Sequence, residues 1–155
     1  MATETAPTEP AAPTEPAWWD SWRGVLFANA KVLHAVESSL QEHSGISLAT
    51  LDALGRLFDA PDQRLRMQEL QGRSLFTPSG MTRLIDRMEE AGYVTRENVP
   101  GDRRGVLVVL TSEGARTYEQ ALGKHRADIE REFGSRLSTM QHQAVATALD
   151  QFWHD

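Results

Sequence analysis

The sequence predicts a mainly helical fold with a small β component (α+β), and three patterns lead to that prediction. Apolar residues recur at spacings of three and four near both ends of the 155-residue chain, which is typical of amphipathic helices. A shorter stripe with the same period lies in the middle of the chain. Two runs rich in aliphatic and β-branched residues follow that stripe, and the glycine-containing segment between them indicates a β-hairpin.

The first 17 residues are predicted to form a disordered tail. The hexapeptide APTEPA occurs twice in succession there, at 6–11 and 12–17. Proline, threonine and glutamate without aliphatic residues bury too little apolar surface to offset the entropy lost on ordering the chain. The tail lacks the basic and apolar regions of a secretory signal, and no apolar run approaches the length of a membrane span. We therefore expect a cytoplasmic protein without a membrane partner.

Residues 18–45 are predicted to form one long dimerisation helix. Apolar side chains alternate there at spacings of three and four and form a continuous seam, and a second subunit is the simplest partner to cover so much apolar surface. Gly45 is expected to end the helix. The seam consists of Trp19, Trp22, Leu26, Asn29, Leu33, Val36 and Leu40.

Residues 46–111 are predicted to form a compact lobe of short elements. Thr77 suits the N-cap of a helix and Pro78 its first position, and the apolar stripe of that helix defines an inward face. The stripe consists of Met81, Leu84, Ile85 and Met88. The predicted elements of the lobe are helices at 47–58 and 67–73, the helix from Thr77 to the stop at Gly92, and strands at 93–99 and 106–110.

Residues 112–155 are predicted to form C-terminal dimerisation helices. Thr111 or Ser112 caps a long helix, and the segment STMQ at 138–141 has the pattern of a capping box, in which two residues satisfy each other's backbone donors. The stripe of the last helix comprises Val145, Leu149 and Phe152.

Short helices followed by a helix with a polar outer face and then by a hairpin are typical of a winged helix-turn-helix, which predicts double-stranded DNA as a partner. Small polar side chains near the start of the third helix would let it enter a major groove, where they reach base edges or phosphates. The alternative is an ordinary amphipathic helix with a solvated arginine face. The candidate DNA contacts on this helix are Thr77, Ser79, Gly80, Thr82, Arg83 and Arg87.

The hairpin loop PGDRRG at 100–105 supplies further DNA-binding candidates. Arg103 and Arg104 beside glycines are suited to a narrow minor groove, and Asp102 is near enough to brace the Arg104 guanidinium. The alternative is a solvated turn that keeps the hairpin soluble. The chain carries a net charge of −6, yet residues 64–104 hold eight arginines and six acidic residues, so the middle is basic within an acidic envelope.

The chain resembles the multiple-antibiotic-resistance regulator (MarR) family of bacterial winged-helix transcription factors. Three segments carry this resemblance: HSGIS at 43–47, SGMTRLIDRMEEAGYVTREN at 79–98 and GDRRGVLVVLTSEG at 101–114. They contain Ser-x-x-Thr-Arg, Met-Glu-x-x-Gly, Asp-x-Arg and Leu-Thr-x-x-Gly in order and with the expected spacing.

The resemblance implies a homodimer that binds a pseudo-palindromic operator, mostly as a repressor, with Arg104 in the minor groove, Asp102 as its brace and Arg103 nearer the phosphates. It also implies release of DNA by a small, often aromatic or phenolic, acid. The residues that we expect at the dimer interface are Trp19, Trp22, Leu26, Leu33, Val36, Leu149 and Phe152.

Asp52 and Arg96 fall where a urate-responsive branch of the family places ligand-binding residues. That branch also uses a tryptophan on an extra N-terminal helix, where this chain has its repeat; Trp22 lies nearby in the sequence without matching it residue for residue and is the third ligand-binding candidate. An Asp52–Arg96 salt bridge and a tryptophan in the dimer core are the simpler interpretations.

Other function classes find less support. The five histidines (34, 43, 125, 142 and 154) show no i, i+4 pair, and the chain has no cysteine, so no metal ligands or cofactor are expected. No catalytic motif or phosphate-binding loop occurs, which predicts that the chain is not an enzyme. The alternative to a DNA-binding regulator is a winged-helix protein-interaction module without specific DNA binding.

Overall fold

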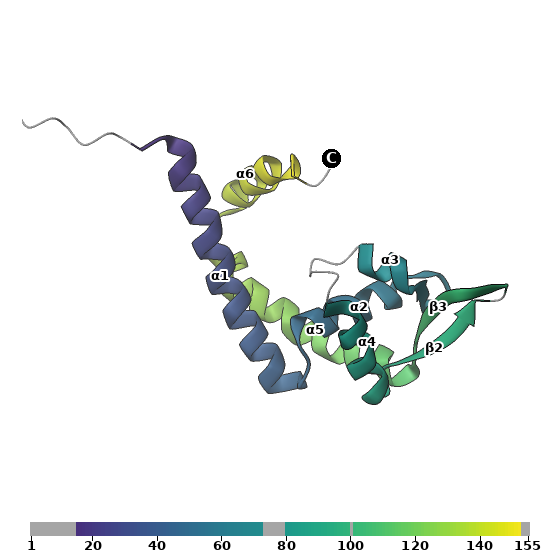
Figure 1. Cartoon of the computed structure of the whole chain (residues 1–155). Coiled ribbons are helices and arrows are strands. Elements are labelled where there is room, and N and C mark those ends of the chain that lie inside the picture. Colours follow the sequence, from purple (N-terminus) through teal and green to yellow (C-terminus); the bar gives the residue numbers. More distant parts are fainter. Residues whose placement is uncertain (1–14, 73–79, 100, 153–155) are drawn as a thin grey trace, which may run out of the picture. The chain divides into compact units, whose positions relative to one another are not determined.

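The computed structural model describes residues 15–72, 80–99 and 101–152, and it confirms a mainly helical fold with one small sheet (Figure 1). The chain divides into two units, residues 1–31 and 32–155, and each is described by itself. None of the helices in the described ranges is long and apolar enough to cross a membrane. In chain order the elements are α1 (Ala17–Ser44), α2 (Leu48–Phe58), η1 (Pro61–Gln63), β1 (Arg64–Arg66), α3 (Met67–Gly72), α4 (Met81–Glu90), β2 (Val94–Val99), β3 (Asp102–Leu110), α5 (Ser112–Glu132), η3 (Gly134–Arg136) and α6 (Thr139–Asp150).

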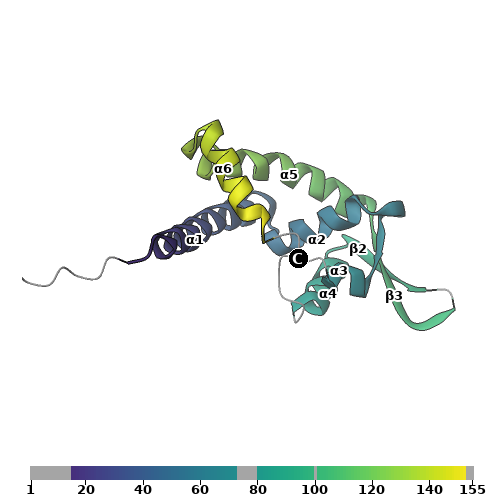
Figure 2. The same ribbon diagram turned by 90° about the horizontal axis from the view of Figure 1, so that it is seen from above.

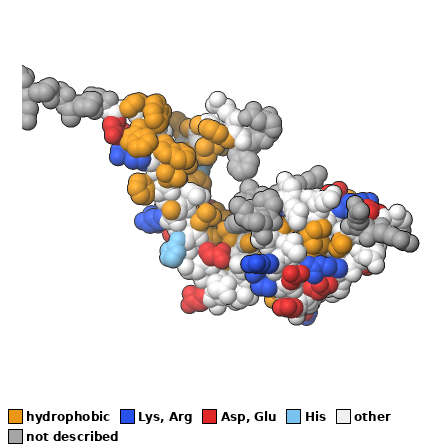
Figure 3. Space-filling view, in the orientation of Figure 1, with side chains coloured by type: hydrophobic (Ala, Val, Ile, Leu, Met, Phe, Trp, Pro, Cys, Tyr) orange, Lys and Arg blue, Asp and Glu red, His pale blue; other side chains and the backbone are white. Residues whose placement is uncertain are grey.

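Helix α1 has the length that the sequence predicts, and Gly45 ends it with a φ of +66°. Its two ends differ in burial. In the first unit, large apolar side chains of α1 are exposed, and they gather on the surface seen in Figure 3. In the second unit, Val36 and Leu40 are buried within the single chain. The exposed apolar residues of the first unit are Trp18, Trp22, Val25, Leu26 and Phe27.

The core of the second unit is one cluster of aliphatic side chains. Leu40 of α1, Leu54 of α2, Ile85 of α4 and Val108 of β3 are each at most 1% exposed. Tyr118 of α5 joins this cluster from one side. Helix α4 and the sheet therefore share one hydrophobic core, and this core holds the candidate DNA-binding elements in place.

The sheet contains a strand that the sequence analysis did not predict. Strand β1 pairs antiparallel with β3, which gives the strand order β1-β3-β2. Arg64 lies opposite Val109 and Arg66 lies opposite Leu107, while Leu65 between them is partly buried. A three-residue strand has too short an alternation to be distinguished from a loop, because its stability comes from pairing with a distant segment.

The hairpin turn is shorter than the predicted loop. Val99 pairs directly with Asp102, so β3 begins inside the predicted loop segment. Gly101 has a φ of +80°, which suits glycine at a tight turn. The register shifts between Asn98 and Val99, and a Cβ on Gly105 would lie 2.7 Å from both the Asp102 carboxylate and the Val99 side chain. Close packing at this irregularity, rather than loop geometry, therefore requires glycine at 105.

The helix caps of the C-terminal part agree with the sequence analysis. The Thr111 hydroxyl accepts a hydrogen bond from Gly114 N at 3.0 Å, and Ser138 and Gln141 form the predicted capping box. Helix α6 ends at Asp150, so Phe152 lies beyond the helix whose stripe it is predicted to complete. Among the described residues of α6 none is buried; Leu149 is 36% exposed, and Phe152 after it is 79% exposed.

Candidate nucleic-acid interface

Helix α4 has a buried face and a polar face, as its sequence predicts. The four residues of the apolar stripe are all buried, which turns the remaining positions outward. Gly80, Thr82, Arg83 and Arg87 are exposed, and so is Asp86. Thr77 and Ser79, which complete the predicted DNA-contacting set, lie outside the described residues, as does the predicted start of the helix.

The two arginines of this face are available to a ligand. Neither Arg83 nor Arg87 forms an ion pair with another residue of the described ranges. Acidic and basic side chains are interspersed on the surface over α4 in Figure 3. The face therefore offers two guanidinium groups within one turn of helix, a spacing that suits contacts with base edges and phosphates.

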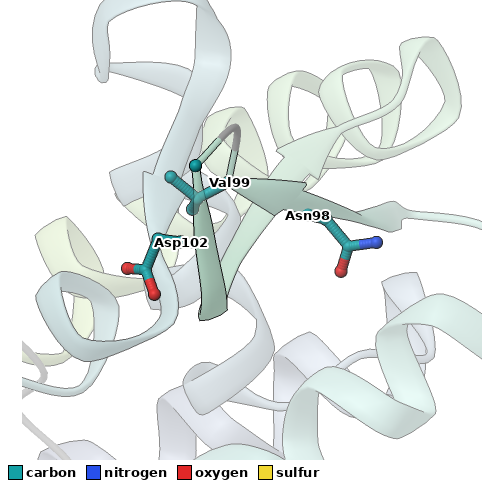
Figure 4. Close-up of a pocket in the computed structure, with 4 residues that line it drawn as sticks. Asn98, Val99 and Asp102 are labelled. Atoms are coloured by element: carbon teal, nitrogen blue, oxygen red, sulfur yellow. The ribbon is translucent and has the colours of Figure 1, made fainter.

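The β2–β3 hairpin projects from the helices of the second unit in both ribbon views (Figures 1 and 2). Near its tip an open pocket is lined by Asn98, Val99, Gly101 and Asp102 (Figure 4). The side chains of Arg103 and Arg104 lie outside the described residues, so the predicted contact of Asp102 with Arg104 stays a prediction.

The Asp102 carboxylate accepts hydrogen bonds from Gly105 and from Arg66. Its Oδ1 accepts a hydrogen bond from Gly105 N at 3.1 Å, and its Oδ2 accepts one from Arg66 Nη1 at 3.2 Å. Arg64, two residues before Arg66, pairs with Glu97 of β2 at 3.7 Å. Both β1 arginines thus form ion pairs with acidic residues of the hairpin. These contacts could not be predicted from the sequence, because β1 itself was not predicted.

The predicted Asp52–Arg96 salt bridge is wrong. Asp52 accepts a hydrogen bond from Arg56 Nε at 2.9 Å, one turn further along α2. Arg96 instead donates to Asp86 at 2.6 Å and to Glu89 at 2.5 Å. Arg56 is nearer to Asp52 because it lies one turn further along the same helix. The carboxylates of Asp86 and Glu89 are nearer to Arg96 because they face β2 from α4. Trp22, the third ligand-binding candidate, belongs to the first unit and is 49% exposed.

Histidines and acidic residues of the described ranges form no group of three that could hold a metal ion. A ring nitrogen of His43 lies 2.9 Å from the Ser39 carbonyl oxygen, and one of His142 lies 2.9 Å from that of Gly134. These two rings therefore have local backbone partners.

A polar-faced helix set on a three-stranded antiparallel sheet whose hairpin projects outward defines a winged helix-turn-helix protein. The sequence model of the MarR family matches residues 44–105, which include α2 to α4, β1, β2 and the start of β3. Over these residues the chain is similar to the MarR family, and relatives and structural neighbours that are transcriptional regulators of this family match it as well.

Relatives of known name agree with this assignment. The transcriptional repressor YetL of Bacillus subtilis is 35% identical over 104 residues, which cover 67% of this chain and 62% of YetL, somewhat under two thirds of that relative's length. Among solved structures, AbsC of Streptomyces coelicolor superposes with a TM-score of 0.82 at 29% identity and covers 92% of this chain and 95% of AbsC.

Two similar structures contain DNA. Sco3205, a MarR family regulator of Streptomyces coelicolor solved in complex with DNA, has a TM-score of 0.82 at 25% identity, with 91% of this chain and 89% of that chain covered. A mutant of MarR from Escherichia coli, complexed with operator DNA, has a TM-score of 0.75 at 26% identity, with 86% and 93% covered.

Proposed function

We propose that this chain is a DNA-binding repressor of transcription that acts as a homodimer on a pseudo-palindromic operator and has no enzymatic activity. The observation that carries this proposal is the polar face of α4, with Arg83 and Arg87 free of ion pairs to other described residues, beside a projecting hairpin. The DNA complexes of Sco3205 and of Escherichia coli MarR, and the name of the repressor YetL, support it.

In this proposal α4 lies in the major groove and the hairpin lies along the adjacent minor groove. Arg83 and Thr82, with Ser79, face base edges, while Thr77, Gly80 and Arg87 lie near phosphates. Arg104 enters the minor groove, where the negative potential is strongest, Asp102 orients it, and Arg103 stays near the phosphates.

A second copy of the chain covers the apolar surface that one copy leaves exposed. In the first unit Trp22 is 49% and Leu26 is 45% exposed; in the second unit Leu33 is 41% and Leu149 is 36% exposed. Trp19, at the start of the predicted seam, is partly exposed. Val36, by contrast, is 2% exposed and is covered by its own chain. Exposed apolar side chains on each unit of a regulator with a palindromic target are best explained by a symmetric dimer.

The test of the function is binding to the duplex upstream of the chain's own gene at several salt concentrations. A dimer that makes about six phosphate contacts loses affinity by on the order of a thousandfold between about 50 and 200 mM salt. An unrelated duplex of the same length serves as the control. Absence of binding at low salt would refute the DNA-binding proposal and favour the protein-interaction module.

The hairpin is tested separately. Arg104→Ala is expected to weaken operator binding by roughly 1–3 kcal/mol without changing the oligomeric state, because a minor-groove contact is lost. Arg103→Ala is the matched variant. It is expected to reduce the slope of log affinity against log salt concentration by about one, as for the loss of one phosphate contact. Equal affinity of Arg104→Ala and the wild type would refute the groove assignment.

Release of DNA by a small aromatic acid stays a prediction, with Trp22, Asp52 and Arg96 as its candidate residues. Asp52 and Arg96 already have protein partners, so an acid would compete with carboxylates for Arg96. Thermal shift with aromatic acids, urate and divalent metals tests this, because a ligand that prefers the folded state raises the melting temperature.

A further inference from the structure

Arg96 bridges the proposed DNA-recognition helix to the hairpin. It lies in β2 opposite the fully buried Val108 of β3, so its backbone is part of the rigid sheet. Its Nη2 donates to Asp86 Oδ1 at 2.6 Å and its Nη1 donates to Glu89 Oε2 at 2.5 Å. One planar guanidinium thus holds two carboxylates that lie three residues apart on α4.

The arginine of this bridge is partly buried, whereas its two carboxylates are exposed. The Arg96 side chain is 26% exposed, against 51% for Asp86 and 40% for Glu89. Burial alone would lower the pKa of Arg96, but the hydrogen bonds to Asp86 and Glu89 outweigh burial and raise that pKa. Both contacts are charge-assisted hydrogen bonds, which are among the stronger interactions available to a partly buried side chain.

The position of these carboxylates matters for DNA. Asp86 lies on the polar face of α4 between Arg83 and Arg87, the two residues proposed to contact DNA. A carboxylate that swings freely there would repel phosphates and would pair with the neighbouring arginines. Asp86 and Glu89 pair with Arg96 of β2, and Arg83 and Arg87 have no acidic partner among the described residues.

We propose that Arg96 is a positioning residue for operator recognition: it sets the orientation of α4 against the hairpin and keeps two carboxylates of α4 away from the DNA. This inference rests on the proposed DNA-binding function. In this proposal Arg96 has the same role in the free protein and in the DNA complex, and that role does not depend on a small-molecule effector.

The experiment compares affinities for the operator duplex and for an unrelated duplex. Arg96→Ala is expected to lower operator affinity by about tenfold or more, as for the loss of two charge-assisted hydrogen bonds. It is also expected to lower the ratio of the affinity for the operator to the affinity for unrelated DNA (the operator-to-unrelated ratio). Arg96→Lys keeps the charge without the planar fork and is expected to restore only part of that ratio. Arg56→Ala is the matched control, because Arg56 is also a partly buried arginine, 19% exposed, and its ion pair with Asp52 lies within α2.

A triple variant separates charge from position. Arg96→Ala/Asp86→Asn/Glu89→Gln removes the two uncompensated carboxylates and is expected to recover binding to unrelated DNA but not the operator-to-unrelated ratio. Full recovery of that ratio would overturn the positioning role, since charge alone would then explain the loss. Operator affinity of Arg96→Ala equal to that of the wild type would overturn it as well.

Hydrogen exchange in the absence of DNA distinguishes the two proposals. Arg96→Ala is expected to speed amide exchange across residues 81–90, whereas Arg56→Ala is expected to leave that segment unchanged. If the wild type binds no DNA and Arg96→Ala still exchanges faster, the proposed function is refuted, whereas the structural role of the Arg96 bridge is supported. Unchanged exchange would refute the positioning role itself.

Discussion

Asp62 and Gln63, which lead into β1, adopt φ angles of +53° and +54°. This left-handed region is disfavoured for residues with a Cβ, although aspartate tolerates it better than glutamine because its short side chain bonds locally. Two such residues in succession turn the chain from α2 into β1, where Arg66 reaches Asp102. Backbone strain at 63 is therefore the local cost of placing the β1 arginines beside the hairpin.

Gln63→Gly is expected to stabilise the protein by about 0.5–1 kcal/mol, because glycine adopts a positive φ without steric strain and the bond from the amide of residue 63 to the Ala60 carbonyl is kept. Thermal unfolding measures the change. The control is Gln120→Gly, an exposed position within α5, where the same substitution is expected to destabilise by about 1 kcal/mol. Destabilisation by both substitutions would contradict the strain at 63.

At the scale of elements, a buried carboxylate joins the second-unit part of α1 to α5. Asp128 is 1% exposed and accepts hydrogen bonds from Ser39 at 2.6 Å, Lys124 at 2.7 Å and Arg131 at 2.7 Å. Burial alone would raise the pKa of Asp128, but these hydrogen bonds outweigh it and hold that pKa well below its usual range. The ionised carboxylate therefore stabilises the packing of α1 against α5.

Asp128→Asn is expected to lower the free energy of unfolding by about 1–3 kcal/mol at neutral pH, since an asparagine keeps the shape but loses the charge. Because the folded-state pKa lies below the unfolded value of about 3.9, the wild-type advantage is complete above about pH 5 and declines as pH falls below that unfolded value. Chemical denaturation between neutral and acidic pH measures this decline.

Glu130→Gln provides the matched control on the same helix, because it removes one negative charge from an exposed position. Its stability is expected to follow the wild-type pH dependence. If Asp128→Asn were to follow the wild-type curve as well, the cluster would not be the source of the acid sensitivity.

At the scale of the whole molecule, the proposed dimer depends on the exposed apolar side chains. Leu33→Asp is expected to abolish the dimer and operator binding together, because a carboxylate at a position 41% exposed in one copy would be buried in the pair. Sedimentation analysis measures the oligomeric state, and the operator duplex measures binding.

Ser38→Asp is the control for this prediction. Ser38 is exposed on the same helix and lies roughly 140° around it from Leu33. A dimer is expected to persist in this variant. A Leu33→Asp protein that remained dimeric and bound the operator would exclude the predicted seam as the interface.

Local sequence determined much of this molecule. The Ser138–Gln141 capping box, the Thr111 cap, the stop at Gly45 and the buried stripe of α4 depend on neighbours a few residues away, so the sequence pattern alone predicts each of them. The same patterns identify α4 and the hairpin as the candidate DNA-binding elements.

Tertiary structure alone decided which charges meet. Strand β1 forms only by pairing with the distant β3. The Arg66–Asp102 pair and the bridge from Arg96 to Asp86 and Glu89 also join residues that are distant in the sequence, from 7 positions for Arg96 and Glu89 to 36 for Arg66 and Asp102. Ion pairing depends on distance in space, and many acidic residues are equally plausible partners for each arginine in the linear sequence. Sequence thus determined the helices and the polar face of α4, whereas packing of α4 against β2 decided that Arg96 pairs with Asp86 and Glu89 and not with Asp52.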